Sequence, residues 1–386
     1  MMNKRMKKLI AMFALVAILA SVALVPIEVS AANDFYGDYT DVAKIYDYGS
    51  CPSLQGLAVG SQKLYAIKIG GNDDKAFISM TDKDSGSTVK LYNADDNSYF
   101  FTYLDHANDM DVWGIDGYSN IFVATTKQGA NGIIRLKRDG NNLNKVATYH
   151  LKCNGEDICA TAMGIVGVSD GKIHFITKWA MQLYTGSVDV NATNATIEMT
   201  EFCSITKSRV YIKGEYLDLS NFVNQGMGYH DGTLFVPISG DDSQLNRSVI
   251  MVFDLNNATP GSTVYPTEAL VFRVTSSAYS ALCEFESCDI CSGDGKLYFG
   301  VQRRKTNSDT DHDGIAYFDG YTYSRLPADA PTSKPTGYTV RYDANGGSGT
   351  MADTAVIYGV TSKLRTNTFT RNGWDFAGWH AYRTTQ

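Results

Sequence analysis

Three carboxylates at alternate positions form the segment of this chain that could most directly bind a cation. The run is Asp309-Thr-Asp311-His-Asp313-Gly314. Alternate carboxylates can converge on a hard cation, and the glycine permits the sharp turn that this needs. An EF-hand would have an acidic ligand at the twelfth loop position, where Gly320 stands, so the set is incomplete. We therefore expect either a calcium site that holds a hairpin together or a metal-free Asp/Gly-rich turn.

Seven cysteines are the other residues with chemistry of their own. Cys153 and Cys159 flank the short loop NGEDI, and in an exported protein they predict a disulfide. Cys288 and Cys291 have the spacing of a redox or zinc pair, but no second pair and no histidine-rich segment lies near them in the sequence. We therefore interpret that pair as strand residues facing the interior. The full set is Cys51, Cys153, Cys159, Cys203, Cys283, Cys288 and Cys291.

A short phrase recurs five times and indicates the elements that position these residues. Each copy has a small or polar residue, an apolar run, a Gly-containing turn and a strand centred on an aromatic residue. The copies are about 60 residues apart with no helical periodicity between them, which is typical of sheets repeated around an axis. The aromatic anchors are Tyr65, Phe122, Phe175, Phe235 and Tyr298.

Strand-like segments follow each phrase, so we predict an all-β fold, a β-propeller over residues 34–326. Five blades are favoured. Six are the alternative, because residues 207–222 could supply extra strands or a long insertion. The segment DVAKIYDY precedes the first phrase and has no blade of its own. It would fit as the outer strand that completes the last blade and covers its edge.

The first residues of the five phrases occupy equivalent places when the copies are aligned. In a propeller these places surround the mouth of the central channel, where we predict a ligand-binding ring. His106 and Asp109 lie beside this ring in the sequence and are included in the predicted site. The alternative is that the ring side chains only join neighbouring blades. The ring consists of Gln55, Asn108, Thr161, Gln225 and Glu286.

Glycoside hydrolysis needs more carboxylates than this ring offers. A five-bladed glycosidase would place three separated carboxylates in the channel, two for the chemistry and one to tune the acid. Glu286 is the one carboxylate in the ring. Asp109, Asp111 and Asp289 lie next to ring positions in the sequence, but alternation would turn some of them away from the channel. We therefore predict no catalytic residues and a protein that is not an enzyme, with a glycoside hydrolase as the last alternative.

The N-terminus and the overall charge restrict where the protein acts. A cationic start, a long apolar run and small residues at 29–31 predict a cleaved secretory signal over residues 1–31. The net charge of −7 becomes more negative once that basic segment is removed. Such a surface disfavours nucleic acid and polybasic membrane binding as functions. We expect a secreted or cell-surface protein with no membrane span after cleavage.

Beyond the predicted propeller, a proline-rich linker is expected over residues 327–337, followed by a small β-rich module over 338–386. The module carries VRYDANGG, an FTRNG turn and an FAGW ending. These segments resemble the Listeria–Bacteroides repeat, the internalin B-repeat type of module. That resemblance implies a β-grasp-like unit without catalysis on an extracellular bacterial protein.

The repeated phrases themselves also resemble a known family. QGLAVGSQKLYAIK, HANDMDVWG with IFVATT, and QGMGYHDGTLFVPISG are similar to segments of the helveticin J family, over roughly residues 54–321. The resemblance implies a non-enzymatic, bacteriocin-like propeller that binds a target on a bacterial cell surface. The alternative is an adhesin that binds a host glycoprotein, mucin glycan or immunoglobulin. Beyond the calcium considered above, no cofactor is expected.

Overall fold

A computed structural model describes residues 37–126, 132–207, 210–212, 215–217, 219–240, 247–267, 271–323, 337–357, 364–373, 376 and 378–379. All regular structure in these segments is β-strand. No helix in the described part of the chain has the length and apolarity of a membrane span. The predicted signal (1–31) and residues 327–336 of the predicted linker lie outside the described residues.

In the described residues, the large domain has five mainly antiparallel sheets, each built around one copy of the repeated phrase. The first contains β2 (Ser53–Val59), β3 (Lys63–Ile69), β4 (Ala76–Asp82) and β5 (Thr88–Lys90). The second contains β7 (Asp109–Ile115), β8 (Tyr118–Ala124), β9 (Ile133–Asp139) and β10 (Asn142–Cys153), and β10 also pairs with β6 (Tyr92–Asn93), β11 (Glu156–Asp157) and β15 (Asn194–Glu198).

The remaining three sheets follow the same order. The third contains β12 (Ala162–Ser169), β13 (Lys172–Trp179), β14 (Gln182–Asp189), β16 (Thr200–Ile205) and β23 (Thr263–Val264). The fourth contains β19 (Val223–Asn224), β20 (Gly228–His230), β21 (Thr233–Ser239), β22 (Arg247–Asp254) and β24 (Val271–Thr275). The fifth contains β25 (Leu282–Ile290), β26 (Leu297–Arg304), β27 (Gly314–Phe318) and β1 (Tyr39–Lys44). Parallel pairs occur in these sheets at β10–β6, β10–β15 and β16–β23.

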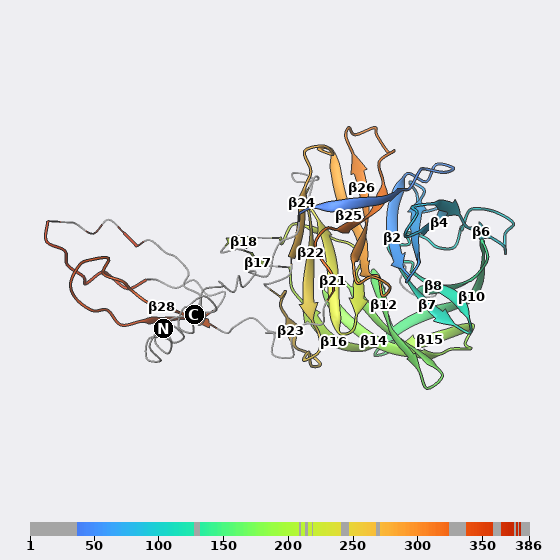
Figure 1. The fold of residues 1–386 in the computed structure, drawn as a ribbon. Coiled ribbons are helices and arrows are strands. Elements are labelled where there is room, and N and C mark those ends of the chain that lie inside the picture. The colour runs from blue at the N-terminus through green and yellow to red at the C-terminus, as the bar shows by residue number, and fades with distance from the viewer. Residues whose placement is uncertain are drawn as a thin grey trace, which may run out of the picture.

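The sheets succeed one another around the domain in chain order, which gives a propeller-like arrangement (Figure 1). The first strands of the phrases contact each other in sequence, β2 with β7, β7 with β12, β12 with β20, and β20 with β25. β25 returns to contact β2. The all-β prediction is confirmed. In the segment that suggested a sixth blade, β17 (Val210–Ile212) pairs with β18 (Glu215–Leu217) in a two-stranded hairpin.

The hydrophobic core is divided among the interfaces between consecutive sheets. In the described residues each apolar cluster draws its members from two neighbouring sheets, and one of them joins the fifth sheet to the first. The aromatic anchors of the phrases are almost fully buried in these interfaces. A large aromatic side chain at the centre of each second strand therefore does what the repeat predicts: it packs one sheet against the next.

The N-terminal strand closes the fifth sheet. β1 pairs antiparallel with β27, from Tyr39 opposite Phe318 to Lys44 opposite Gly314. The prediction for DVAKIYDY is thereby confirmed. Because β1 comes from the far end of the chain, this pairing covers the outer edge of the last sheet and fixes both ends of the domain together.

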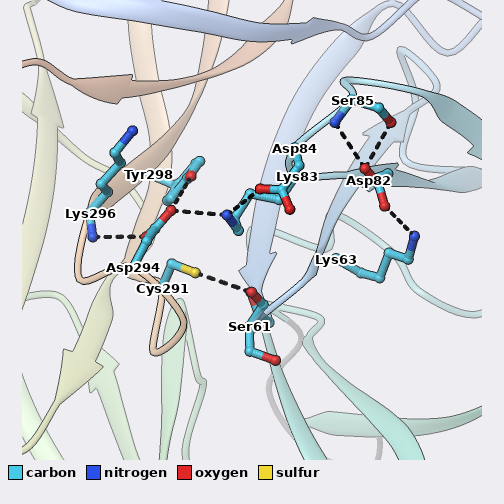
Figure 2. Close-up of polar contacts among 11 residues, drawn as sticks. Ser61, Lys63, Asp82, Lys83, Asp84, Ser85, Cys291, Asp294, Lys296 and Tyr298 are labelled. Atoms are coloured by element: carbon cyan, nitrogen blue, oxygen red, sulfur yellow. Dashed lines mark hydrogen bonds and ion pairs between the residues drawn. The ribbon is translucent and has the colours of Figure 1, made fainter.

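Polar contacts join the first and fifth sheets near the turns of β4 and β26 (Figure 2). The ammonium of Lys83 lies 2.6 Å from Asp84 and 3.1 Å from Asp294, and both contacts raise its pKa. Tyr298 donates to the same Asp294 carboxylate at 2.9 Å. Beside them the Cys291 thiol donates to the carbonyl of Ser61 at 3.7 Å. Cys291 therefore has a structural place between sheets, in keeping with our interpretation of the Cys288–Cys291 pair.

Replacing Lys83 by methionine is expected to lower the free energy of unfolding by about 1 kcal/mol, because it removes the ion pair that joins the two sheets. The Lys63–Asp82 pair within the first sheet offers a matched control, since its side chains are more exposed. Lys63→Met should cost less than about 0.5 kcal/mol. Urea denaturation of both variants tests this, and equal losses would contradict a special role for the junction.

The C-terminal module has a small structure of its own. β28 (Gly337–Val340) pairs antiparallel with β29 (Thr354–Ile357). Among the described residues of the module, Trp379 is the centre of an aromatic group, with ring centroids 4.8 Å from Tyr342 and 4.9 Å from Phe376. Aromatic residues of the FAGW ending thus pack within the module. The β-grasp-like fold of the module remains a prediction.

Candidate functional site

Most of the predicted ring residues lie in one hydrogen-bonded chain between sheets. The amide of Asn108 donates to the carbonyl of Thr161 at 2.8 Å, and the Thr161 hydroxyl donates to the carbonyl of Lys178 at 2.8 Å. The ammonium of Lys178 then donates to the carbonyl of Gln225 at 2.8 Å. Gln55 is buried in β2. The geometry agrees with the alternative that these side chains join neighbouring sheets.

Two glutamates end this chain. The Gln225 amide donates to Glu284, and the carboxyl groups of Glu284 and Glu286 share a hydrogen bond. The Gln302 amide, with its nitrogen toward Glu286 and its oxygen toward Arg304, contacts each at 3.2 Å. Burial raises the pKa of Glu286 well above its usual range, and the charge of Glu284 raises it further. Burial and the neighbouring carboxyl group thus both favour the protonated form of Glu286.

Lys178 is a fully buried lysine that joins this chain at the carbonyl of Gln225. Burial lowers its pKa to about 8, although the charge of Asp109 opposes that shift. A buried lysine with a depressed pKa can be neutral or charged near neutral pH. Lys178 and the two glutamates are thus the titratable members of one continuous polar cluster. We name it the mouth cluster, and its members are Asn108, Thr161, Lys178, Gln225, Glu284, Glu286 and Gln302.

The groups that meet at the central axis of the propeller-like domain belong to the residues one or two places after the ring positions. Asp109 accepts hydrogen bonds from the backbone N–H of Met163 at 3.0 Å and of Met227 at 3.1 Å. Its other oxygen lies 2.6 Å from the hydroxyl of Ser287, which also contacts the carbonyl of Leu57 at 3.3 Å. All five phrases therefore meet at or beside Asp109, which is fully buried, and a role for it in ligand binding stays a prediction.

Glycine is required where the axis is most crowded. A Cβ at Gly226 would lie 2.7 Å from the Asp109 carboxylate and 2.9 Å from the Ser287 side chain. In the phrases that hold Asp109, Gly226 and Ser287, the residue directly after the ring position is the one that faces the axis. The sequence alignment therefore assigned the inward-facing residues one position too early. A second layer lies further along the strands, where burial raises the pKa of Asp111 to about 7 and of Asp289 well above its usual range.

His106 lies outside this cluster. Its imidazole is 3.1 Å from the Asp73 carboxylate in an exposed loop, and both side chains are more than a third exposed. Among the described residues, its hydrogen-bond partner is Asp73, which does not belong to the mouth cluster. The structure thus places His106 as a hydrogen-bonded loop residue, and a role for it in ligand binding stays a prediction.

The predicted calcium site is not formed. Asp309 pairs with His312 at 2.8 Å and Asp311 pairs with Lys44 at 2.9 Å. Asp313 is buried and pairs with Lys68 at 2.9 Å. The three carboxylates diverge toward three different side chains, and the described residues contain no group of ligands that could hold a metal ion.

The predicted disulfide is absent as well. All seven cysteines are described, and all are buried free thiols. The thiol of Cys159 points to the carbonyl of Thr126, to which it donates at 2.8 Å, rather than to Cys153. Cys153 ends β10 opposite Glu156, so a tight backbone hairpin already holds the loop that the disulfide would have closed.

Sequence reasoning missed the buried lysines and Glu284. Lys68 and Lys178 each follow an aromatic anchor by three residues in an otherwise apolar strand, KLYAIKI and KIHFITK. A charged residue at the same place in two copies of an apolar strand is a signal for a buried ion pair, because an unpaired charge there would be too costly. Glu284 lies before the fifth phrase, outside the aligned segment, and no comparable signal marks it.

The comparisons with known proteins support the C-terminal module. A family model for the Listeria–Bacteroides repeat domain matches residues 338–385, which confirms that prediction. No curated protein sequence matches the chain. The resemblance to the helveticin J family therefore has no match to support it.

Solved structures resemble the large domain only loosely. The β-xylosidase RS223 is 9% identical with a TM-score of 0.38, over 71% of this chain and 94% of that one. A GH43_1 enzyme from Xanthomonas citri, complexed with xylotriose, is 8% identical with a TM-score of 0.39, over 78% and 98%. Regucalcin, a calcium-binding protein from Agrobacterium tumefaciens, is 10% identical with a TM-score of 0.37, over 75% and 95%. We draw no functional conclusion from such distant similarity.

Proposed function

We propose that this chain is a non-enzymatic extracellular recognition protein that binds a cell-surface glycan through the face that carries the mouth cluster. A bacterial or a host surface is its target, as the sequence resemblances imply. In this proposal the secretory signal exports the chain, and the Listeria–Bacteroides repeat domain serves as a spacer or attachment module. The bacteriocin-like activity itself has no support beyond the sequence resemblance and is not part of the proposal.

The observation that carries this proposal is the network of hydrogen bonds that fixes the amides and carboxyl groups of the mouth cluster. Glycosidases hold their two carboxyl groups about 5–5.5 Å apart when they retain configuration and about 6.5–9.5 Å apart when they invert it. Glu284 and Glu286 share a hydrogen bond, so they are too close to flank a glycosidic bond. Amides and carboxyls already held by neighbours suit a rigid hydrogen-bonding surface, which favours binding over chemistry.

The proposal also takes the propeller-like domain as five-bladed. Support comes from the five sheets, from the contacts of β25 with β2 and from the convergence of all five phrases on Asp109. A closed ring brings short segments from distant parts of the chain to one face, which makes that face a natural place for a ligand.

Glu284→Gln is expected to weaken glycan binding about 10-fold or more, because a hydrogen bond to a charged group contributes roughly 1.5–3 kcal/mol. Glu284 is half-buried at the end of the cluster, so its amide variant should still fold. Glu201→Gln, at an exposed position of β16, is the matched control and should bind like the wild type. A glycan array followed by titration measures both. Folded wild-type protein that binds no glycan or surface polysaccharide would contradict the proposal.

A glycoside hydrolase is the second candidate, and the raised pKa of Glu286 favours it, because a general acid must hold its proton at neutral pH. If the protein hydrolyses any member of a polysaccharide panel and Glu286→Gln lowers the rate 100-fold or more, this candidate replaces the first. We expect no hydrolysis by either protein.

A further inference from the structure

A small pocket on the fifth sheet lies outside the mouth cluster. It has a volume of about 150 Å³ and lies between the closing strand β1, the end of β26 and the segments before β25 and β27. The residues that line it are Asp41, Ala43, Lys44, Tyr279, Arg303 and His312. Arg303 and Gln302 are consecutive in β26, so alternation turns them to opposite faces of the sheet. The pocket and the mouth cluster can therefore be altered separately.

Each acidic or basic side chain of the pocket is fixed by an ion pair or a hydrogen bond to another residue. The guanidinium of Arg303 is almost fully buried, and one of its nitrogens contacts both oxygens of Asp41 at 2.8 and 3.0 Å. Its Nε donates to the carbonyl of His312 at 2.8 Å. Asp309 orients the His312 ring at 2.8 Å, and Asp311 holds Lys44 at 2.9 Å. The wall is thus preorganised, which lowers the entropy cost of binding.

The charges of the pocket balance. Arg303 pairs with Asp41 and Lys44 with Asp311, and the Asp309 carboxylate lies within reach of the charge of Lys305, whose ammonium is 6.0 Å from the Tyr279 ring centroid. Among the described residues around the pocket these three cations are matched by three carboxylates, and the Asp41 carboxylate that faces the pocket is already paired, so it does not favour a cation. Because donors and acceptors are both present without a net charge, the pocket suits a neutral ligand with several hydroxyl groups.

An aromatic ring completes the pocket. Tyr279 lies with its ring centroid 4.9 Å from the Arg303 guanidinium carbon and 5.4 Å from the His312 ring. Its backbone N–H is anchored by the Ser276 hydroxyl at 2.9 Å. The aromatic ring can pack against the apolar C–H groups of a sugar, and the fixed donors and acceptor beside it can bind the sugar hydroxyls.

We propose that this pocket binds a single neutral sugar ring, the terminal residue of a glycan. The volume is below the roughly 300–1,000 Å³ of sites for drug-sized ligands, so one ring fits where an oligosaccharide does not. The proposal rests on the proposed function, since it names the class of glycan that the protein recognises, but it concerns residues that the mouth cluster does not use.

The test is titration calorimetry of the folded full chain with D-glucose, D-galactose, D-mannose, D-xylose, L-fucose and N-acetylglucosamine. Sialic acid and glucosamine serve as the anionic and cationic controls. We expect at least one neutral sugar to bind with a Kd of about 1 mM. Tyr279→Ala should weaken that binding 10-fold or more, whereas Tyr118→Ala, at a half-exposed tyrosine of β8, should leave it unchanged.

Lys44→Ala provides a second pocket variant, because its ion pair with Asp311 is exposed and the fold should tolerate its loss. It should weaken sugar binding 3-fold or more even if Tyr279→Ala fails to fold. Binding of the charged sugars alone, or of no monosaccharide, would overturn the pocket proposal. Binding that survives both pocket variants but is lost in Glu284→Gln would overturn it while leaving the proposed function intact.

Discussion

Asp109→Ala is expected to lower the free energy of unfolding by roughly 3–5 kcal/mol, the largest effect of any single substitution at the axis. The change leaves the backbone N–H groups of Met163 and Met227 without their acceptor, and Ser287 loses its contact with the carboxyl group. Each buried donor left unsatisfied costs about 1–3 kcal/mol. Asp139→Ala, at an exposed position at the end of β9, should change stability by less than about 0.5 kcal/mol.

The proton on Asp109 explains why its amide should be tolerated. Burial raises the pKa of Asp109 to about 8, so the carboxyl is mainly neutral at pH 7. The Ser287 hydroxyl contacts both Asp109 and the carbonyl of Leu57, but it has one hydrogen to donate. A neutral Asp109 can donate to Ser287, which then donates to Leu57. An asparagine preserves this arrangement with its NH₂ group, and Asp109→Asn should cost less than about 1 kcal/mol.

The same raised pKa predicts that stability falls as the pH rises from about 4 to about 8. An unfolded aspartate has a pKa near 3.8, so the native state holds the Asp109 proton more tightly between pH 4 and 8. Its stabilising contribution is complete below about pH 4 and is lost as the pH rises through 8. Asp111, Asp289 and Glu286 are raised in the same direction. Lys178, lowered to about 8, opposes this trend only between about pH 8 and 10.5.

Thermal unfolding monitored from pH 5 to pH 9 measures both effects. The midpoint of the wild type should fall by several degrees over this range, and that of Asp109→Asn should fall less. A wild-type midpoint that is constant or rises with pH would contradict protonated carboxyls at the axis. An Asp109→Ala variant as stable as the Asp139→Ala control would contradict the convergence of the phrases on Asp109.

The sequence predicted the fold because aromatic anchors and turns are local signals that repeat. Tyr65 and Phe235 are buried between sheets as the periodicity indicates, and the unpaired segment before the first phrase closes the last sheet. Each of these features depends on residue type and spacing alone. Packing between neighbouring sheets then follows from burial of the anchors, without any need to know the register of the innermost strands.

The register at the axis could not be predicted, because β-bulges interrupt the alternation there. The pairing of β2 shifts between Leu54 and Leu57, and that of β25 shifts between Phe285 and Ser287. Gln55 and Glu286 lie within these bulges, so counting in steps of two from the anchors fails at the very residues chosen for the ring. A bulge adds one residue to one strand and turns the following side chains to the other face.

The predictions of a cation site and a disulfide failed because the residues concerned instead contact partners that are distant in the sequence. Asp311 pairs with Lys44, and Asp313 pairs with Lys68, from the opposite end of the domain. Ring closure brings these lysines to the aspartates, and no pattern within the loop indicates that the lysines will be there. The free thiol of Cys159 likewise faces Thr126, a residue of the second sheet.

Lys68→Met is expected to cost about 3–5 kcal/mol, because it leaves the buried carboxylate of Asp313 without its cation. The Lys68 ammonium is fully buried and contacts Asp313 at 2.9 Å, the carbonyl of Ile45 at 3.2 Å and the carboxylate of Asp47. Burial already raises the pKa of Asp313, and Lys68 opposes that shift. The lysine thus stabilises a charge that the fold would otherwise exclude.

The double variant Lys68→Met/Asp313→Asn separates this ion pair from a calcium role for Asp313. Removing both charges should recover more than half of the lost stability, because no uncompensated charge remains in the interior. Lys44→Met, which breaks only the exposed pair with Asp311, should cost less than about 0.5 kcal/mol. Urea denaturation with calcium or with a chelator completes the test. Since Asp313 is already paired, the wild type should unfold at the same urea concentration in both. A calcium-dependent gain in stability that Asp313→Asn abolishes would restore the calcium site and refute the ion-pair assignment.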